Sequence, residues 1–261
     1  MLKNRIIFTL LYGDGHYHLS RNFRLQRVGD LSWVKENYEL DSIARSIDEL
    51  VILDVSRETR DHAAFSMQIE QLGKNCFMPI AAGGGIQTLE HAFQLFQAGV
   101  DKLVLNTMFF SKPDFVKELV DLFGSQSIIA SIDYRLMEDL SRRVFVKNGT
   151  EDVAMDLADA MLHVQSLGAG EIYLTSINND GTGNGFDLDA LRLGAEICSV
   201  PIIASGGADN HAHLIEGINT AGVSAVSTAH LFNFMSDGLY EARKQMVDSG
   251  VSLSDWRIRV F

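Results

Sequence analysis

Short apolar runs alternate with stretches of helical periodicity along the whole chain. β-rich runs occur at residues 5–11, 49–55, 78–82, 102–106, 127–133, 171–177, 200–204 and 223–227. Between most of them apolar residues recur at helical spacing, as do Leu89, Ala92, Phe93 and Phe96. Eight strands with crossover helices in roughly 250 residues predict an α/β fold of the (βα)8 TIM barrel type. An open doubly wound sheet is the alternative, but it usually needs fewer strands.

The two halves of the chain repeat one another. The run PIAAGGG recurs as PIIASGG 122 positions later, and RIIFTLL recurs as SIIASID at the same offset. ELVILDV also recurs after 122 positions as EIYLTSI, and GVDKLVLNT recurs after 123 positions as GVSAVSTAH. Repetition at a fixed spacing is the signature of duplicated structural units. We therefore expect one barrel domain, 1–261, built from two (βα)4 half-barrels at about 1–123 and 124–261.

Composition and charge narrow the function. The 261 residues carry a net charge of −12 and are 46% hydrophobic. Nucleic-acid binding rests on a basic face, so this acidic chain argues against a nucleic-acid partner. An anionic small-molecule substrate would have to be bound by local structural features such as glycine-rich turns. The two cysteines do not resemble a disulfide framework, and no apolar run approaches the ~20 residues of a membrane span, so we expect a cytoplasmic protein without a membrane partner.

Glycine-rich turns follow two of the predicted strands. Gly83, Gly84 and Gly85 end the third strand, and Gly206 and Gly207 follow the seventh. Glycine lets backbone N–H groups approach a phosphate closely, although a tight turn alone would also use it. Barrel enzymes carry their sites at the C-terminal ends of the strands, so other strand-end residues could join these turns. They are Asn106 and Thr107 for the first site, and Asp180, Gly181, Thr182, Ala229 and His230 for the second.

A carboxylate is missing from one of two equivalent strand ends. In the register of the repeat, Leu11 at the end of the first strand corresponds to Asp133 at the end of the fifth. Two carboxylates can divide acid and base roles because their environments separate their pKa values, whereas a leucine can do neither. His16 and His18 share one face of the next predicted strand, but no carboxylate or Cys cluster matches them, and we expect no metal site.

These residues resemble a known family. The stretches DGHYHLSRNF, DELVILDV, GGGIQTLEHAFQLFQAGVDKLVLNT, FGSQSIIASID, GAGEIYLTSINNDGT and PIIASGGA are similar to the cyclase subunit of imidazole glycerol phosphate synthase, a HisF-like pattern that runs from Arg5 to about Phe232. The resemblance implies a (βα)8 barrel, no metal or organic cofactor, and a HisH-like glutaminase partner on the N-terminal face of the barrel. It further implies that ammonia made by the glutaminase crosses the barrel to the opposite face.

The resemblance also implies an ammonia gate. Arg5, Glu49, Lys102 and Glu171 match the charged residues at the channel entrance of the family. Four ionisable groups on strand starts would be costly in a core unless they were mutually paired. The alternative interpretation is that these four residues only form salt bridges at the bottom of the barrel and that no ammonia passes between them.

The resemblance carries over only part of the site at the other face. The strand-end residues given above match the family's phosphate-binding residues, except that His230 stands where the family usually has Ser. Of the family's two catalytic aspartates, Asp133 matches the second, and Leu11 occupies the place of the first. Losing a positioned general base costs about 100- to 10,000-fold in rate.

Three functions remain open. We favour membership of a subgroup of the family that has an apolar residue at the first catalytic position. Proteins of this subgroup act with a glutaminase and with an amidotransferase whose substrate is a sugar. Together they convert an acetamido group of the sugar into an acetamidino group in surface-polysaccharide biosynthesis. One alternative is the histidine-pathway cyclase, which converts a phosphoribulosyl-formimino carboxamide ribotide and ammonia into imidazole glycerol phosphate and aminoimidazole carboxamide ribotide, with Asp14, His16 or His18 supplying the lost proton function. The other is a non-catalytic scaffold that activates a glutaminase.

Overall fold

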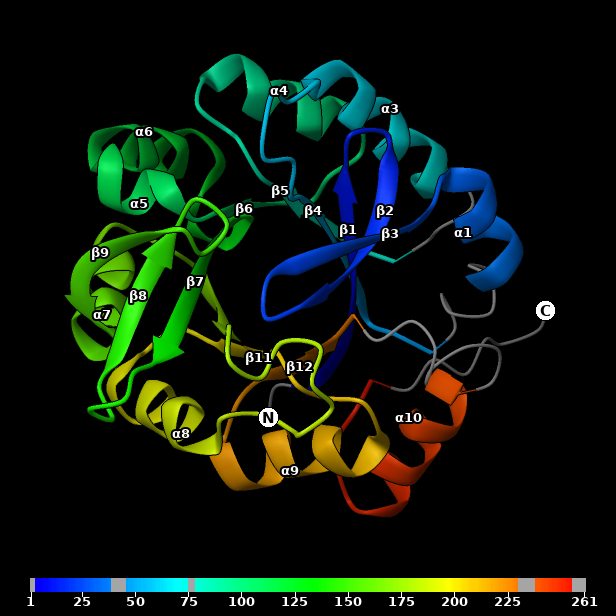
Figure 1. Ribbon diagram of the computed structural model, residues 1–261, viewed down its shortest axis with the longest axis vertical. Coiled ribbons are helices and arrows are strands. Elements are labelled where there is room, and N and C mark those ends of the chain that lie inside the picture. The colour runs from blue at the N-terminus through cyan, green and yellow to red at the C-terminus, as the bar shows by residue number, and fades with distance from the viewer. Residues whose placement is uncertain (1–2, 39–45, 75–77, 230–237, 255–261) are drawn as a thin grey trace.

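Eight parallel strands close into a barrel that is wrapped by helices (Figure 1). The computed structural model describes residues 3–38, 46–74, 78–229 and 238–254. Strand β10 pairs with β7 and with β11, so the sheet has no open end along the barrel. The barrel strands are β1 (Arg5–Gly13), β4 (Glu49–Asp54), β5 (Ile80–Gly83), β6 (Lys102–Leu105), β7 (Ile128–Leu136), β10 (Glu171–Ser176), β11 (Ile202–Ser205) and β12 (Ala225–Thr228). The predicted (βα)8 barrel is confirmed, and the doubly wound sheet is excluded.

Helices fill the crossovers between the strands. Side chains cap several of their first turns; for example, Asp61 accepts a hydrogen bond from the Ala64 N–H, and Asp187 from the Ala190 N–H. Within the described ranges, none of these helices combines the length and the apolar character that crossing a bilayer requires. The helices are α1 (Leu31–Tyr38), α3 (His62–Gly73), α4 (Leu89–Gln97), α5 (Thr107–Ser111), α6 (Pro113–Phe123), α7 (Leu157–Ser166), α8 (Leu188–Ile197), α9 (His211–Ala221) and α10 (Gly238–Asp248), with a short 3₁₀ turn at Ser125–Ser127.

Two antiparallel hairpins extend the barrel at equivalent places. β2 (His16–Arg21) and β3 (Arg24–Gly29) continue from β1, and β8 (Arg142–Val146) and β9 (Glu151–Asp156) continue from β7. The sequence indicated only the first of these four strands. β3 and β9 were missed because their residues are largely polar and partly exposed. β8 was missed because its buried apolar run, Val144–Val146, is only three residues long.

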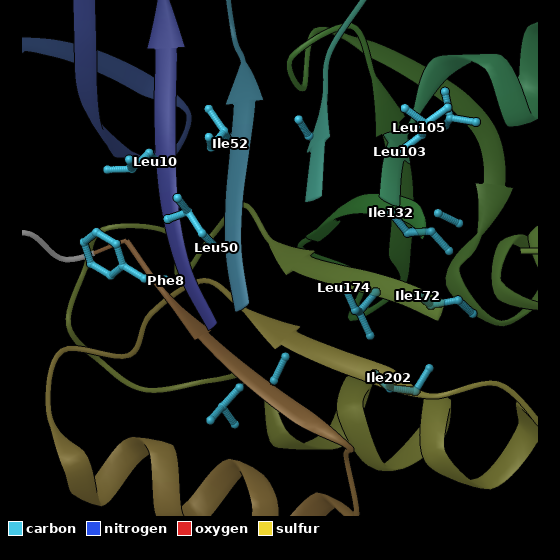
Figure 2. Packing of buried hydrophobic residues seen from close by; sticks show 14 of the residues in the cluster. Phe8, Leu10, Leu50, Ile52, Leu103, Leu105, Ile132, Ile172, Leu174 and Ile202 are labelled. Atoms are coloured by element: carbon cyan, nitrogen blue, oxygen red, sulfur yellow. The ribbon is translucent and has the colours of Figure 1, made fainter. Parts of the chain in front are cut away.

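The barrel strands bury side chains on both faces. Outward-facing residues such as Phe8, Leu50 and Ile172 belong to a cluster that packs between the strands and the helices (Figure 2). Inward-facing residues form a second layer, to which each of the eight strands contributes one side chain. This axial layer consists of Ile7, Val51, Ala81, Val104, Ile129, Tyr173, Ile203 and Ala225. Filling of the interior by layers of side chains is usual for this fold.

Candidate active site and charged ring

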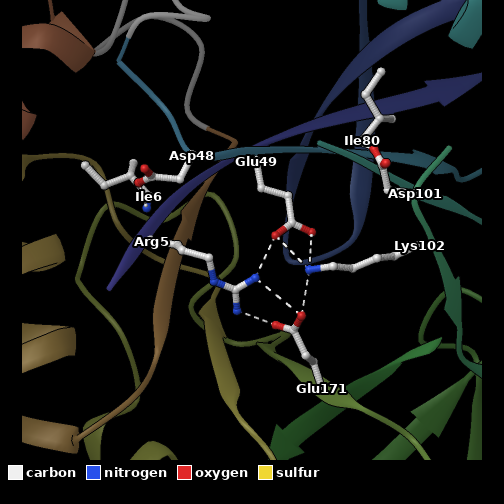
Figure 3. Close-up of polar contacts among 8 residues, drawn as sticks. All are labelled: Arg5, Ile6, Asp48, Glu49, Ile80, Asp101, Lys102 and Glu171. Carbon is white, nitrogen blue, oxygen red and sulfur yellow. Dashed lines mark hydrogen bonds and ion pairs between the residues drawn. The ribbon is translucent and has the colours of Figure 1, made fainter. Parts of the chain in front are cut away.

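Four charged side chains meet at the N-terminal end of the barrel. Arg5, Glu49, Lys102 and Glu171 are the first residues of β1, β4, β6 and β10, so the closure of the barrel brings them together across its axis. Arg5 Nη1 lies 2.7 Å from Glu49 Oε2, and Arg5 also donates to both oxygens of Glu171. Lys102 Nζ lies 2.6 Å from Glu171 Oε1 and 3.1 Å from both oxygens of Glu49 (Figure 3). We call these four residues the charged ring.

Pairing among the four side chains of the charged ring offsets the cost of burying their charges. Burial raises the pKa of Glu49, although Lys102 and Arg5 oppose the rise. Burial acts in the same direction on Glu171, but its hydrogen bonds to Arg5 and the charges of Arg5 and Lys102 outweigh it and lower the pKa of Glu171. Burial disfavours the charge of Arg5, and Glu171 and Glu49 more than restore it, so the pKa of Arg5 is raised. The ring is therefore a buried network of two positive and two negative side chains.

The axial layer separates the charged ring from the opposite end of the barrel. Its members are at most 3% exposed. The ion pairs and this layer together fill the axis, so a small molecule can pass only when side chains move.

A cavity of about 860 Å³ opens at the C-terminal ends of the strands. This is the face at which barrel enzymes carry their sites. Of the sequence-predicted residues, it brings together Leu11, Gly84, Gly85, Asn106, Thr107, Asp133, Asp180 and Ala229. Gly83, Gly181, Thr182, Gly206 and Gly207 lie outside its lining, and His230 lies outside the described residues.

Asp133 lies at the floor of this cavity. Asn106 Nδ2 donates to Asp133 Oδ2 at 3.1 Å and to the Ser131 carbonyl oxygen at 3.0 Å. Burial, reinforced by the negative charge of Asp180, raises the pKa of Asp133 to about 7. A carboxyl group that titrates near neutral pH can both accept and donate a proton. The Asn106 amide is committed to this carboxylate, which leaves its oxygen and its backbone as the groups that could meet a ligand.

The opposite part of the floor is apolar. Leu11 pairs with Leu53 in the register of β1 and β4, and both side chains line the cavity. The neighbouring carboxylate, Asp54, lies 3.7 Å from Arg60 Nε and accepts the Ser56 N–H. The structure thus places a hydrocarbon pair where the repeat would place a second acid.

The glycine turns are shaped by close backbone approaches. A Cβ atom on Gly84 would lie 2.2 Å from the Asp54 carbonyl oxygen, and one on Gly207 would lie 2.0 Å from the Gly185 carbonyl oxygen. Both glycines also have positive φ, 106° and 111°. Only glycine fits these two positions, whether or not a phosphate binds there.

Asp180 holds the β2–β3 hairpin over the cavity. Its carboxylate accepts from Ser20 Oγ at 2.5 Å and from the Phe23 N–H at 3.0 Å. Burial raises the pKa of Asp180, and these two hydrogen bonds oppose the rise. Phe23 and Leu25 thereby become part of the cavity wall. These contacts are a structural role that the sequence did not indicate, and phosphate binding by Asp180 stays a prediction.

Three basic side chains of the cavity were not anticipated. Arg57 and Arg60 follow the end of β4, and Lys147 lies in the β8–β9 turn. Arg57 also donates to the Phe23 carbonyl oxygen at 2.5 Å. Barrel enzymes carry their sites at the C-terminal ends of the strands, and both arginines lie in the segment that follows β4. This position would have identified them from the sequence.

His16 and His18 are placed away from the cavity lining. His16 Nδ1 lies 2.8 Å from the Asp14 carbonyl oxygen, and its other ring nitrogen contacts Arg27. Burial lowers the pKa of His18. His18 is the antiparallel partner of Leu11 in the β1–β2 register, although neither imidazole is among the residues that line the cavity. Among the residues that the structure describes, no group of three or more His, Cys, Asp or Glu side chains is arranged to hold a metal ion.

Comparison with known proteins agrees with the geometry. A closed (βα)8 barrel with a cavity at the C-terminal ends of its strands defines a class that hosts many chemistries. The family model described as "Histidine biosynthesis protein" matches residues 32–236. The chain belongs to this family, and its curated relatives place it with the HisF-type barrels.

The relatives match over almost the whole chain. A putative imidazole glycerol phosphate synthase subunit hisF2 of Parasynechococcus marenigrum (strain WH8102) is 43% identical over 257 residues, which are 98% of this chain and 95% of that protein. The imidazole glycerol phosphate synthase subunits HisF of Streptococcus sanguinis (strain SK36) and Streptococcus mutans serotype c (strain ATCC 700610 / UA159) are each 34% identical over 97% of this chain. The match covers 99% of the first HisF subunit and 100% of the second.

Proposed function

We propose that the chain is the synthase subunit of a glutamine-dependent amidotransferase, and that its acceptor is a sugar whose acetamido group becomes an acetamidino group in surface-polysaccharide biosynthesis. The observation that carries the proposal is the Leu11–Leu53 pair at the floor of a cavity that retains Asp133. Ring closure to an imidazole needs a divided acid and base, whereas the delivery of ammonia needs an axis, a gate and an acceptor site.

The partner in this proposal is a glutaminase on the N-terminal face of the barrel. The charged ring supports it, because two positive and two negative side chains at the axis can exchange partners and open without leaving a lone buried charge. Ammonia enters through the ring, crosses the axial layer and reaches the cavity. A separate amidotransferase subunit activates the sugar amide for attack.

Asp133 then has a proton-handling role at the acceptor. Attack by ammonia on a carbon centre produces a positively charged nitrogen that must lose a proton. With a pKa of about 7, Asp133 can take this proton at neutral pH.

A direct assay distinguishes this function from ring closure. The purified chain is supplied with ammonium salt at alkaline pH and with the phosphoribulosyl-formimino carboxamide ribotide, and the ultraviolet absorbance is followed. We expect no turnover by the chain itself, and robust turnover would overturn the sugar proposal. In the Leu11→Asp variant we expect measurable turnover, with Leu140→Asp, at an exposed leucine outside the cavity lining, as the control.

The cyclase of histidine biosynthesis is the second candidate. Two observations favour it: the raised pKa of Asp133, which suits acid–base catalysis, and the HisF subunits among the relatives. In this function the chain converts the ribotide and ammonia into imidazole glycerol phosphate and aminoimidazole carboxamide ribotide, and the same assay supports it.

The charged ring offers a test against a non-catalytic scaffold. With the glutaminase present, Arg5→Ala and Lys102→Ala are expected to uncouple glutamine hydrolysis from amination of the acceptor. Unchanged amination per glutamine hydrolysed would favour a barrel that only activates its partner.

A further inference from the structure

Four hydroxyl groups meet inside the barrel on the cavity side of the axial layer. Thr9 Oγ1, Tyr173 Oη and Ser227 Oγ form a triangle in which each oxygen lies 2.8 Å from the other two. Ser205 Oγ donates to Tyr173 Oη at 3.1 Å. We call these four residues the hydroxyl cluster. They come from four different strands, β1, β10, β11 and β12, and only the closed barrel assembles them.

The hydroxyl cluster lies between the two parts of the proposed path. Thr9, Tyr173 and Ser205 line the cavity, and Ser227 is buried behind them. The ring of Tyr173 belongs to the axial layer, so its hydroxyl marks the place where the apolar axis ends and the cavity begins. Asp133 lines the same cavity as Tyr173.

Counting donors and acceptors defines what the cluster can bind. The four hydroxyl groups have four hydrogens, and the four hydrogen bonds among them use every one. Lone pairs remain on Thr9, Ser205 and Ser227, because each hydroxyl oxygen can accept about two hydrogen bonds. Burial raises the pKa of Tyr173, so the phenol stays protonated and the cluster stays neutral. The cluster therefore offers acceptors and no free donor.

We propose that the hydroxyl cluster is a binding site for neutral ammonia, at which ammonia donates its N–H groups to Thr9, Ser205 and Ser227 and keeps its own lone pair free. This inference rests on the proposed function, because ammonia has to arrive through the axis. A charged ammonium ion would be costly to move through the apolar axial layer, so the neutral form is the one that reaches the cluster. The free lone pair is the nucleophile, and a site that had a spare hydroxyl hydrogen would block it.

The test uses the isolated chain and ammonium chloride. The protein is labelled with ¹³C at the tyrosine Cζ positions, and ammonium chloride is added at neutral and at alkaline pH. The chain has six tyrosines, so the signal of Tyr173 can be assigned by its loss in Tyr173→Phe. We expect a saturable shift of the Tyr173 signal that follows the concentration of neutral ammonia. Tyr134, a buried tyrosine of the outer cluster, is the internal reference and should not move.

Two variants keep the proposal falsifiable. Ser205→Ala removes a hydroxyl at the cavity side and is expected to weaken ammonia binding about 3- to 10-fold, the usual net effect of one hydrogen bond. Thr9→Val combined with Ser227→Ala removes two buried acceptors and should abolish the saturable shift, while an unmoved Tyr134 signal shows that the fold is kept. Potassium chloride at the same ionic strength is the control for a cation or salt effect.

The outcomes separate this inference from the proposed function. The absence of a saturable shift, an equal shift with potassium chloride, or a shift that survives in the double variant would each overturn the ammonia site. If the site fails while glutamine-dependent amination proceeds, only this inference is wrong. If ammonia binds at the cluster but no acceptor is aminated, the proposed function is wrong and the binding site stands.

Discussion

At the N-terminal end of the barrel, Glu171 is buried between Arg5 and Lys102, and its pKa is lowered. At the C-terminal end, Asp133 is buried beside the neutral donors of Asn106 and Ser131, and its pKa is raised to about 7. The same chemical group thus behaves in opposite ways within one barrel. Burial raises the pKa at both places, and at Glu171 the hydrogen bonds and charges of Arg5 and Lys102 outweigh it.

The comparison suggests different tasks for the two ends. A carboxylate that two cations hold ionised cannot exchange protons near neutral pH, so Glu171 is suited to a structural or gating role. A carboxyl group that is free of cationic partners and titrates near pH 7 is suited to proton transfer. Variants at the two ends should therefore affect different measurements.

The largest effect is expected from Asp133→Asn. The amide keeps the shape of the side chain but cannot accept the proton released by ammonia, so the rate of acceptor amination should fall about 100- to 10,000-fold. The measurement is product formation at saturating ammonia. Asp114→Asn, at a fully accessible position of α6, is the matched control and should leave the rate unchanged. A rate within a few-fold of the unmodified chain would contradict a proton-transfer role for Asp133.

The next effect is on stability at the charged ring. Arg5→Ala leaves Glu49 and Glu171 buried with Lys102 as their remaining ring partner, so the free energy of unfolding should fall by about 3 kcal/mol. Urea unfolding of the purified chain measures it. The double variant Arg5→Ala, Glu171→Gln should recover part of the loss, because it removes the charge that lost its partner. If the double variant were as unstable as the two single losses combined, the two residues would not be coupled.

The pH dependence of stability should have opposite signs for Asp133 and Glu171. The pKa of Asp133 is raised, so the folded chain retains a proton that the unfolded chain releases, and stability falls as pH rises through the window from roughly 4 to 7. The pKa of Glu171 is lowered, so its contribution is present above the unfolded pKa and is lost as pH falls. Urea unfolding at pH values across this window should show less loss of stability in Asp133→Asn. An identical profile in the variant would show that Asp133 titrates normally.

The smallest effect is expected from an ion pair at the surface. Arg143 and Asp152 lie 2.9 Å apart, like the pairs of the charged ring, but their side chains are 39% and 35% exposed. Arg143→Ala should therefore change the free energy of unfolding by less than about 1 kcal/mol. A loss as large as that of Arg5→Ala would mean that burial does not set the difference between the two kinds of pair.

Much of the fold could be predicted from the sequence because it is encoded locally. All eight barrel strands were identified to within about three residues at either end, because β-rich runs and helical spacing alternate strongly. The hairpins were largely missed, since β3 and β9 are largely polar and β8 has an apolar run of only three residues. The residues of the charged ring could be chosen only through the family resemblance, and the structure brings all four into contact.

The cavity shows where prediction from sequence stops. The position of residues at strand ends placed Asn106 and Asp133 on the same face of the barrel, with Asn106 as a phosphate ligand. In the structure the Asn106 amide donates to Asp133. The same reasoning grouped Gly206 and Gly207 with the lining residues, although in the structure they shape the turn against Gly185 and Ser176. Which atoms of a residue remain available depends on neighbours from other strands, and a local pattern does not contain them.

The sequence by itself determined the alternation of barrel strands and helices, the repeated segments, and the leucine at position 11 where the repeat has Asp133. These follow from periodicity and residue identity, which each segment carries alone. The tertiary structure decided that Arg5 meets Glu171, that four hydroxyls of separate strands share one set of hydrogen bonds, and that Asp133 is buried beside Asn106 and Ser131. Barrel closure joins strands that are more than a hundred residues apart, and the charge and burial that each side chain experiences exist only after that closure.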